Sequence, residues 1–207
     1  MQIADELLKL DETALLKILQ DPAASMFQKN IACRRLAVIG TKAAVRALAA
    51  LLSDPKLAHY ARFGLGPITD PAVDEALRMA LPKLKGRLLV GVVNTIGQRE
   101  DERAIEPLNK LLRDPDPEVA EAAASAIGNI GGPAAARVLR DALGKTRGPL
   151  RAAVADAGLL CAESLLARGD RAGALALYDT LSRLDIPKQV RLAALHSAFT
   201  AEVRDRQ

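Results

Sequence analysis

The chain has 207 residues, of which half are hydrophobic and only 2% are aromatic. Such an apolar fraction excludes a disordered chain, and the lack of a long uncharged apolar run argues against a transmembrane helix. A formal net charge of +4 is too small to require a nucleic acid as partner. Alanine, leucine and arginine dominate while aromatic residues are scarce, which favours helices over strands.

Short amphipathic segments recur along the chain. In each, a leucine is followed at +3 and +4 by residues that are mostly aliphatic, and the spacings between successive leucines are 33, 29, 31, 31 and 38 residues. Positions i, i+3 and i+4 lie on one face of a helix, so each segment predicts a short helix with one buried stripe. The six leucines are Leu15, Leu48, Leu77, Leu108, Leu139 and Leu177.

A turn follows several of these segments. Asp21, Asp54 and Asp114 each precede a proline, and we expect these carboxylates to cap the helix that comes next. Second helices are expected over residues 31–39, 88–96, 119–130, 150–160 and 190–199.

Glycines mark where several of the second helices should end. Gly40, Gly97 and Gly131 each follow an isoleucine, and we expect them to be C-terminal caps, because glycine adopts a positive φ at least cost.

One such helix pair is too small to bury its own apolar face, so neighbouring pairs must stack. The sequence therefore predicts an all-α fold, an α-solenoid of about six antiparallel helix pairs. We expect one domain over residues 1–207, since no linker or low-complexity stretch divides it. The expected repeats span residues 11–41, 42–70, 71–101, 102–132, 133–170 and 171–203.

Residues 102–143 carry a recognisable repeat motif. The stretches AIEPLNKLLRDPDPEV (104–119) and AAASAIGNIG (122–131) resemble the bacterial HEAT repeat, in the short form called the phycobilisome-lyase HEAT-like repeat. The resemblance extends with departures over residues 11–160. It implies a right-handed superhelix whose second helices line a concave face, and a non-catalytic protein-binding scaffold as the function.

The end of the chain departs from that family. Residues 147–170 predict a second helix longer than the family norm, and ALALY at 174–178 looks closer to a tetratricopeptide helix. The last pair is therefore expected to be HEAT-like with tetratricopeptide character.

The candidate partner-binding residues are His59, Tyr60, Arg62 and Phe63, because the segment 59–63 holds three of the seven His, Tyr and Phe residues of the chain. Gly64, Gly66 and Pro67 follow, so we expect a short helix that leaves a notch, with an aromatic and cationic surface of the kind found at binding hot spots. The alternative is that the rings fill a gap between repeats while the polar ends are solvated. Two further candidates, near the starts of later second helices, are Arg87 and Arg151.

Charge alternates in bands along the chain. Residues 29–62 carry a net +6, residues 78–99 a net +5 and residues 100–121 a net −5. A nucleic-acid groove needs a continuous basic track, and the chain lacks the tryptophans that line the cleft of HEAT-like DNA glycosylases. Nucleic-acid binding is therefore only a second alternative, and a protein or peptide is the expected partner.

Nothing in the sequence indicates an enzyme. His59 and His196 are far apart, and neither has the adjacent glutamate that HEAT-repeat iron hydroxylases use, so no metal site and no cofactor are expected. Cys33 and Cys161 lie in apolar segments and should be buried.

A bilin lyase-like accessory subunit is the first alternative function, and it rests on the family resemblance alone. The N-terminus shows no secretory signal, so the expected location is cytoplasmic, or exported if Met1 is not the native start.

Overall fold

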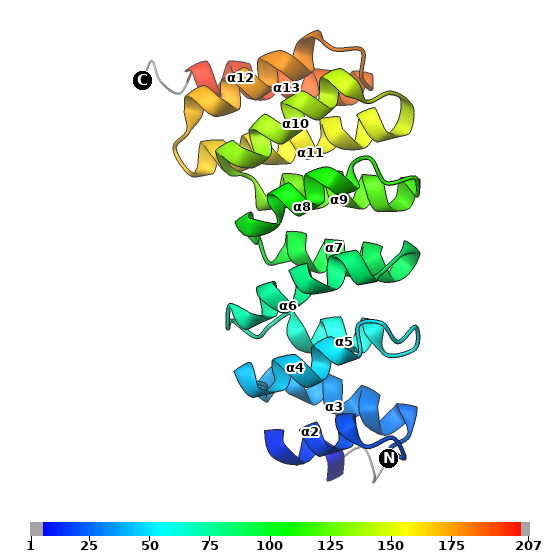
Figure 1. Ribbon diagram of the computed structural model, residues 1–207. Coiled ribbons are helices and arrows are strands. Elements are labelled where there is room, and N and C mark those ends of the chain that lie inside the picture. Colours follow the sequence, from blue (N-terminus) through cyan, green and yellow to red (C-terminus); the bar gives the residue numbers. More distant parts are fainter. Residues whose placement is uncertain (1–5, 204–207) are drawn as a thin grey trace. The chain divides into compact units, whose positions relative to one another are not determined.

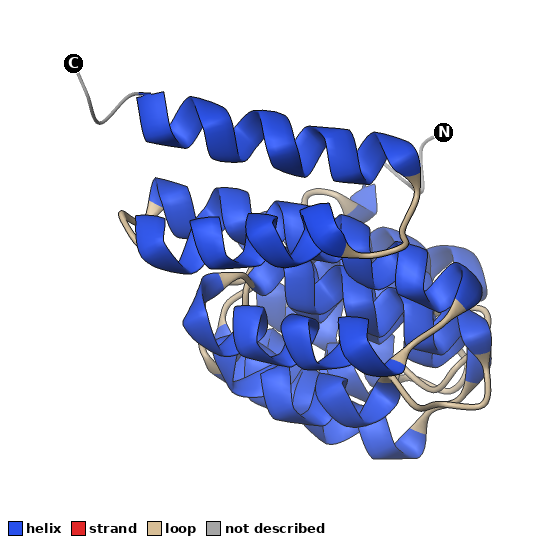
Figure 2. Ribbon diagram, turned by 90° about the horizontal axis from the view of Figure 1, so that it is seen from above, coloured by secondary structure: helices blue, strands red, loops and turns tan. Residues whose placement is uncertain are grey.

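A computed structural model describes residues 6–203, with side chains up to residue 201. The described residues form twelve α-helices and two short 3-10 helices, joined by loops and with no strand (Figure 2). The prediction of an all-α fold of about six helix pairs is confirmed for the described residues. The expectation that the N-terminus carries no secretory signal concerns residues 1–5, which lie outside the described residues.

Two compact units make up the chain, one ending at Thr95 and the other beginning at Ile96. Here they are called unit 1 and unit 2. The single domain and the repeat boundaries expected from the sequence stay predictions.

Unit 1 consists of two layers of helices (Figure 1). The first helices α2, α4 and α6 contact one another in chain order, α3 contacts α5, and the pairs α2–α3 and α4–α5 join the layers. The helix α7 begins in unit 1 and ends in unit 2. The bounds are α2 Glu12–Gln20, α3 Met26–Ile39, α4 Lys42–Ala50, α5 Ala58–Leu65, α6 Ala72–Ala80, η1 Leu81–Lys83 and α7 Gly86–Gln98.

Side-chain caps fix where the helices of unit 1 begin. Ser25 and Gln28 form a reciprocal capping box at the start of α3, which satisfies two backbone donors at once. Thr41 caps α4 and is itself held by Glu12 of the preceding helix pair, whose carboxylate accepts from the Thr41 backbone N–H at 2.7 Å and from its hydroxyl at 2.9 Å. Capping thus also joins neighbouring repeats.

The aspartates that precede proline have a different role from the one expected. Asp21, Asp54 and Asp114 each accept a hydrogen bond from the backbone N–H two residues on, so they close the turn. The helix caps come later in the chain, at Ser25 for α3 and at Asp116 for α9. Each expected cap is displaced because an Asx turn is completed before the helix starts.

Unit 2 repeats the two-layer arrangement. First helices α8, α10 and α12 contact one another, as do second helices α9, α11 and α13. At 20 residues, α11 is the long second helix that the sequence predicts. The bounds are η2 Glu102–Ala104, α8 Ile105–Leu111, α9 Pro117–Ile130, α10 Gly132–Lys145, α11 Gly148–Ala167, α12 Arg171–Arg183 and α13 Lys188–Val203.

Close backbone approach holds the second helices of unit 2 together. A Cβ placed on Gly97 would lie 2.8 Å from Cα of Ala126, and one on Gly128 would lie 2.8 Å from Cα of Ala157. Both pairs are 29 residues apart, so the same contact occurs in two successive repeats. Such contacts need glycine opposite alanine, so no large ring can occupy these positions.

One of the three expected C-caps is wrong. Gly40 and Gly131 are C-caps, but only Gly131 has the expected positive φ, of 66°, whereas Gly40 has a φ of −65° that any residue can adopt. Gly97 lies inside α7, where it makes room for Ala126.

Candidate partner-binding surface

The helix α5 is short because its ends are fixed by local chemistry. The Asp54 carboxylate accepts from the N–H groups of Lys56 and Leu57 at 2.8 and 3.2 Å, which holds the turn before the helix. At the other end Gly66 is the C-cap, and Pro67 follows. The predicted short helix is present, with 8 residues against 14 in α3.

Gly64 does not break α5 as expected but lies within it. A Cβ at this position would be 2.9 Å from the carbonyl oxygen of Cys33 in α3 and 3.0 Å from the side chain of Leu48 in α4. The glycine thereby lets α5 pack closely on both neighbouring helices, and this packing directs the opposite face of α5 outward.

The outward face of α5 carries the predicted aromatic side chains. His59 is exposed, Phe63 one turn later is 54% exposed, and Tyr60 is partly buried. The rings of His59 and Tyr60 meet edge to face, with centroids 5.5 Å apart and planes at 71°. Together with Arg62, these three residues are the predicted binding residues that lie on α5.

Arg62 is bound to the protein itself. Its guanidinium is partly buried and donates from Nη1 to the carbonyl oxygen of Gly91 in α7, at 3.2 Å. The same carbonyl accepts from the Thr95 hydroxyl at 3.0 Å. Burial lowers the pKa of the Arg62 guanidinium below its ordinary value. Arg62 therefore joins α5 to α7, with one hydrogen bond to a backbone group.

The second helices of unit 1 carry no acidic residue. Neither α3 nor α5 nor α7 contains an aspartate or glutamate, although together they hold five lysines and arginines. Exposed Arg34 and Val38 lie on α3, with Val38 76% exposed. Since α3 contacts α5, two neighbouring helices of unit 1 carry exposed apolar and cationic side chains.

The remaining two candidates lie on other helices. Arg87 is exposed at the second position of α7. Arg151 is in unit 2, partly buried on α11, and its Nε has no hydrogen-bond partner. It lines a depression of about 570 Å³ with Arg147 and Asp185. The structure thus gathers four of the six predicted residues on α5 and assigns Arg151 to the other unit.

The groups that could bind metal or act as nucleophiles are dispersed. Within the described residues, no three His, Cys, Asp or Glu side chains lie close enough to hold a metal ion. Both cysteines are fully buried, and burial raises the pKa of Cys33 to about 12 and that of Cys161 to about 11. Neither thiol is therefore activated as a nucleophile. In the described part of the chain, no helix has the length and apolar character that a membrane span needs.

Two solved structures align with the chain over nearly its whole length. An engineered protein aligns with a TM-score of 0.53 at 22% identity, over 94% of this chain and 97% of that one. Human deoxyhypusine hydroxylase in complex with glycerol aligns with a TM-score of 0.49 at 17% identity, over 97% of this chain and 99% of that one. The first likeness supports the solenoid fold. No curated protein matches the sequence.

The family comparison bears directly on the repeat motif. The profile of the family described as HEAT repeats matches residues 86–157. This segment includes the stretches at 104–119 and 122–131 on which the resemblance rests. The narrower resemblance, to the phycobilisome-lyase HEAT-like form and to bacterial chains, stays a prediction. Residues 86–157 are thus similar to HEAT repeats.

Proposed function

We propose that the protein is a non-catalytic, cytoplasmic binding scaffold that presents the second-helix face of unit 1 to a protein or peptide partner. The observation that carries this proposal is the exposed Phe63 and His59 on a layer of helices free of acidic residues. Interface hot spots combine aromatic anchors with arginine. Stacked repeats hold such side chains in place before binding, so little conformational entropy is lost on association.

The charge of this face favours an acidic partner. The cations of α3, α5 and α7 are not offset by carboxylates on the same helices, so an acidic segment would gain attraction without local repulsion. Exposed charges are screened by salt. Binding to this face should therefore weaken as ionic strength rises, while the apolar contact of Phe63 remains.

The test is affinity capture with matched baits. Wild-type protein, Phe63→Asp and Leu160→Asp are immobilised and exposed to extract of the source cells. Leu160 is 46% exposed on α11 of unit 2, so its substitution controls for added charge at an exposed apolar site. A partner that is retained by wild type and Leu160→Asp and lost with Phe63→Asp supports the proposal. Equal capture by all three baits would refute it.

The other two functions are distinguished by separate readouts. A salt-dependent gel shift with single- and double-stranded DNA and RNA would indicate a nucleic-acid partner on the same basic face. A bound chromophore, seen as visible absorbance after incubation with a bilin, would indicate the lyase-like accessory subunit. A scaffold for proteins gives neither signal.

A further inference from the structure

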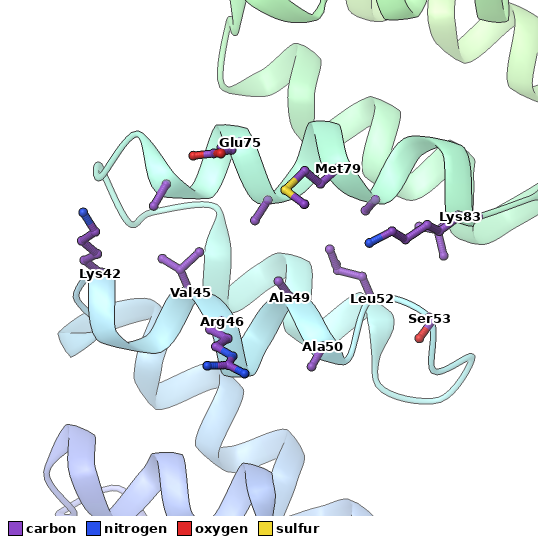
Figure 3. A pocket seen from close by; sticks show the side chains of 14 residues that line it. Lys42, Val45, Arg46, Ala49, Ala50, Leu52, Ser53, Glu75, Met79 and Lys83 are labelled. Carbon is purple, nitrogen blue, oxygen red and sulfur yellow. The ribbon is translucent and has the colours of Figure 1, made fainter.

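A groove runs between the first helices α4 and α6 (Figure 3). Its residues are not part of the second-helix face of unit 1, which is the proposed scaffold surface. Its volume is about 600 Å³. The buried side chains of Val45, Leu52 and Leu84 form the floor. Alanines line much of the rest, and they leave the space open because a methyl group cannot fill it. They are Ala49, Ala50, Ala72, Ala76 and Ala80.

Met79 projects from α6 over this groove and is 58% exposed. A flexible, polarisable side chain of this kind adapts to the shape of an apolar partner. An exposed methionine above a lining of alanine, valine and leucine is thus suited to contact aliphatic side chains.

The two ends of the groove are cationic. Lys42 lies at one end and Lys83 at the other, with the apolar lining between them (Figure 3). Arg46 lines the α4 side, and Glu75 is the single carboxylate among the lining residues. Within the described residues, none of the three cations forms an ion pair. The positive charge is therefore available to a ligand.

The length of the groove matches a short helix. The helical parts of its lining, Lys42–Ala50 of α4 and Ala72–Ala80 of α6, each extend about 12 Å at 1.5 Å per residue, or just over two helical turns. A helix of that length presents an apolar stripe at positions i, i+3 or i+4, and i+7, the pattern that docks in grooves between helices.

We propose that the α4–α6 groove binds an amphipathic helix of a partner protein, whose apolar stripe carries acidic residues at both ends. The apolar side chains lie on the alanine-lined floor beside Met79, and the two acidic ends meet Lys42 and Lys83. Cations at both ends select a ligand with two separated acidic groups. A single carboxylate on an alkyl chain could satisfy only one of them.

The test uses a fluorescein-labelled helical peptide of about 14 residues, with leucines at helical spacing in the middle and glutamates near both ends. Binding is measured by anisotropy at low salt and by NMR of protein labelled with ¹³C at the methionine methyl groups. We expect the Met79 signal to shift and that of Met26, which is on α3 and 43% exposed, to stay. No shift at Met79 with millimolar peptide would overturn the proposal.

Variants test the charged ends and the apolar floor separately. The double change Lys42→Glu and Lys83→Glu should weaken binding about tenfold, and Met79→Glu should abolish it. The matched control is Lys110→Glu with Lys188→Glu, two exposed lysines of unit 2, which should leave the affinity unchanged. Circular dichroism establishes that each variant is folded.

Further outcomes would also contradict this assignment. Equal binding of a peptide with lysines in place of the glutamates, or equal affinity for both double variants, would show that the ends do not select acidic groups. Self-association of the protein that Met79→Glu abolishes would show that the occupant is a second copy. Phe63→Asp should not affect peptide binding, so this test is independent of the proposed scaffold surface.

Discussion

The side chain of Arg62 on α5 packs against Gly91 on α7 and is hydrogen-bonded to its backbone. The Arg62 guanidinium donates to the Gly91 carbonyl oxygen at 3.2 Å, and a Cβ on Gly91 would lie 2.7 Å from Nε of Arg62. The three atoms nearest to that Cβ all belong to Arg62. The lack of a side chain at position 91 therefore creates the space that the guanidinium occupies.

The effect of Gly91→Ala should change sign with the residue at position 62. In the wild type the added methyl displaces the guanidinium, and we expect a loss of about 1–3 kcal/mol in the free energy of unfolding. In an Arg62→Ala background the space is free, and alanine in a helix interior should stabilise by up to about 1 kcal/mol. Urea denaturation of the four proteins of this double-mutant cycle measures both. Equal effects in the two backgrounds would show that the contact carries no energy.

Gly128→Ala should destabilise unit 2 by roughly 1–3 kcal/mol, because its methyl would collide with the backbone of Ala157. Gly144→Ala is the matched control. Gly144 lies within α10, and a Cβ there would meet nothing within 4 Å, so the higher helix propensity of alanine should stabilise by up to about 1 kcal/mol. Thermal unfolding followed by circular dichroism would distinguish the two. A gain in stability from Gly128→Ala would mean that α9 and α11 separate without cost.

The repeat architecture could be predicted because it is encoded locally. The aliphatic triplets that begin at Leu15 and recur to Leu177 mark one buried stripe per repeat, and both the helices and their pairing follow from that pattern. Cap positions could not be predicted as well, because an Asx turn and a helix cap use the same residue types. Asp21 before Pro22 gave the expected signal, yet Ser25 is the cap.

The candidate site was predictable in part. The scarcity of aromatic residues pointed to residues 59–63, and Phe63 and His59 are indeed exposed. The contact of Arg62 with Gly91 could not be predicted from the sequence pattern. It joins two residues 29 apart in the chain, so it depends on how α5 and α7 are placed in space. The α4–α6 groove was also missed. The only trace of the groove in the sequence is alanine at outward positions of α4 and α6. Alanine is common in any helix because of its high helix propensity, so these residues did not indicate a groove.

Glu100 should be replaceable by glycine with a gain in stability. It has a positive φ of 55° at the end of α7, where Asp101 N–H bonds to Ile96 O and Glu100 N–H to Gly97 O. The end of α11 has the same pair of bonds, with Gly169 at the equivalent position and a φ of 84°. A side chain in this region costs about 1 kcal/mol, so Glu100→Gly should stabilise by about that amount.

The control for this prediction is Glu100→Ala, which removes the carboxylate and keeps the strained Cβ. The ion pair between Glu100 and Arg168 spans 3.9 Å at an exposed site, so its loss should cost less than about 0.5 kcal/mol. Differential scanning calorimetry would compare the two variants. If glycine is no more stabilising than alanine, the backbone at position 100 is unstrained.

Stability should fall in alkaline solution because of the two buried thiols. Their ordinary pKa is 9.0, whereas burial raises that of Cys33 to about 12 and that of Cys161 to about 11. Above pH 9 the unfolded chain releases these protons while the folded protein retains them, so their contribution is complete below pH 9 and is lost as pH rises toward 11 and 12. Each thiol should account for up to about 1.4 kcal/mol per pH unit in that range. Replacement of both cysteines by alanine should therefore flatten the dependence of unfolding free energy on pH between about 9 and 11, whatever its effect at neutral pH. Identical slopes for the two proteins would show that the thiols ionise as readily in the folded state as in the unfolded one.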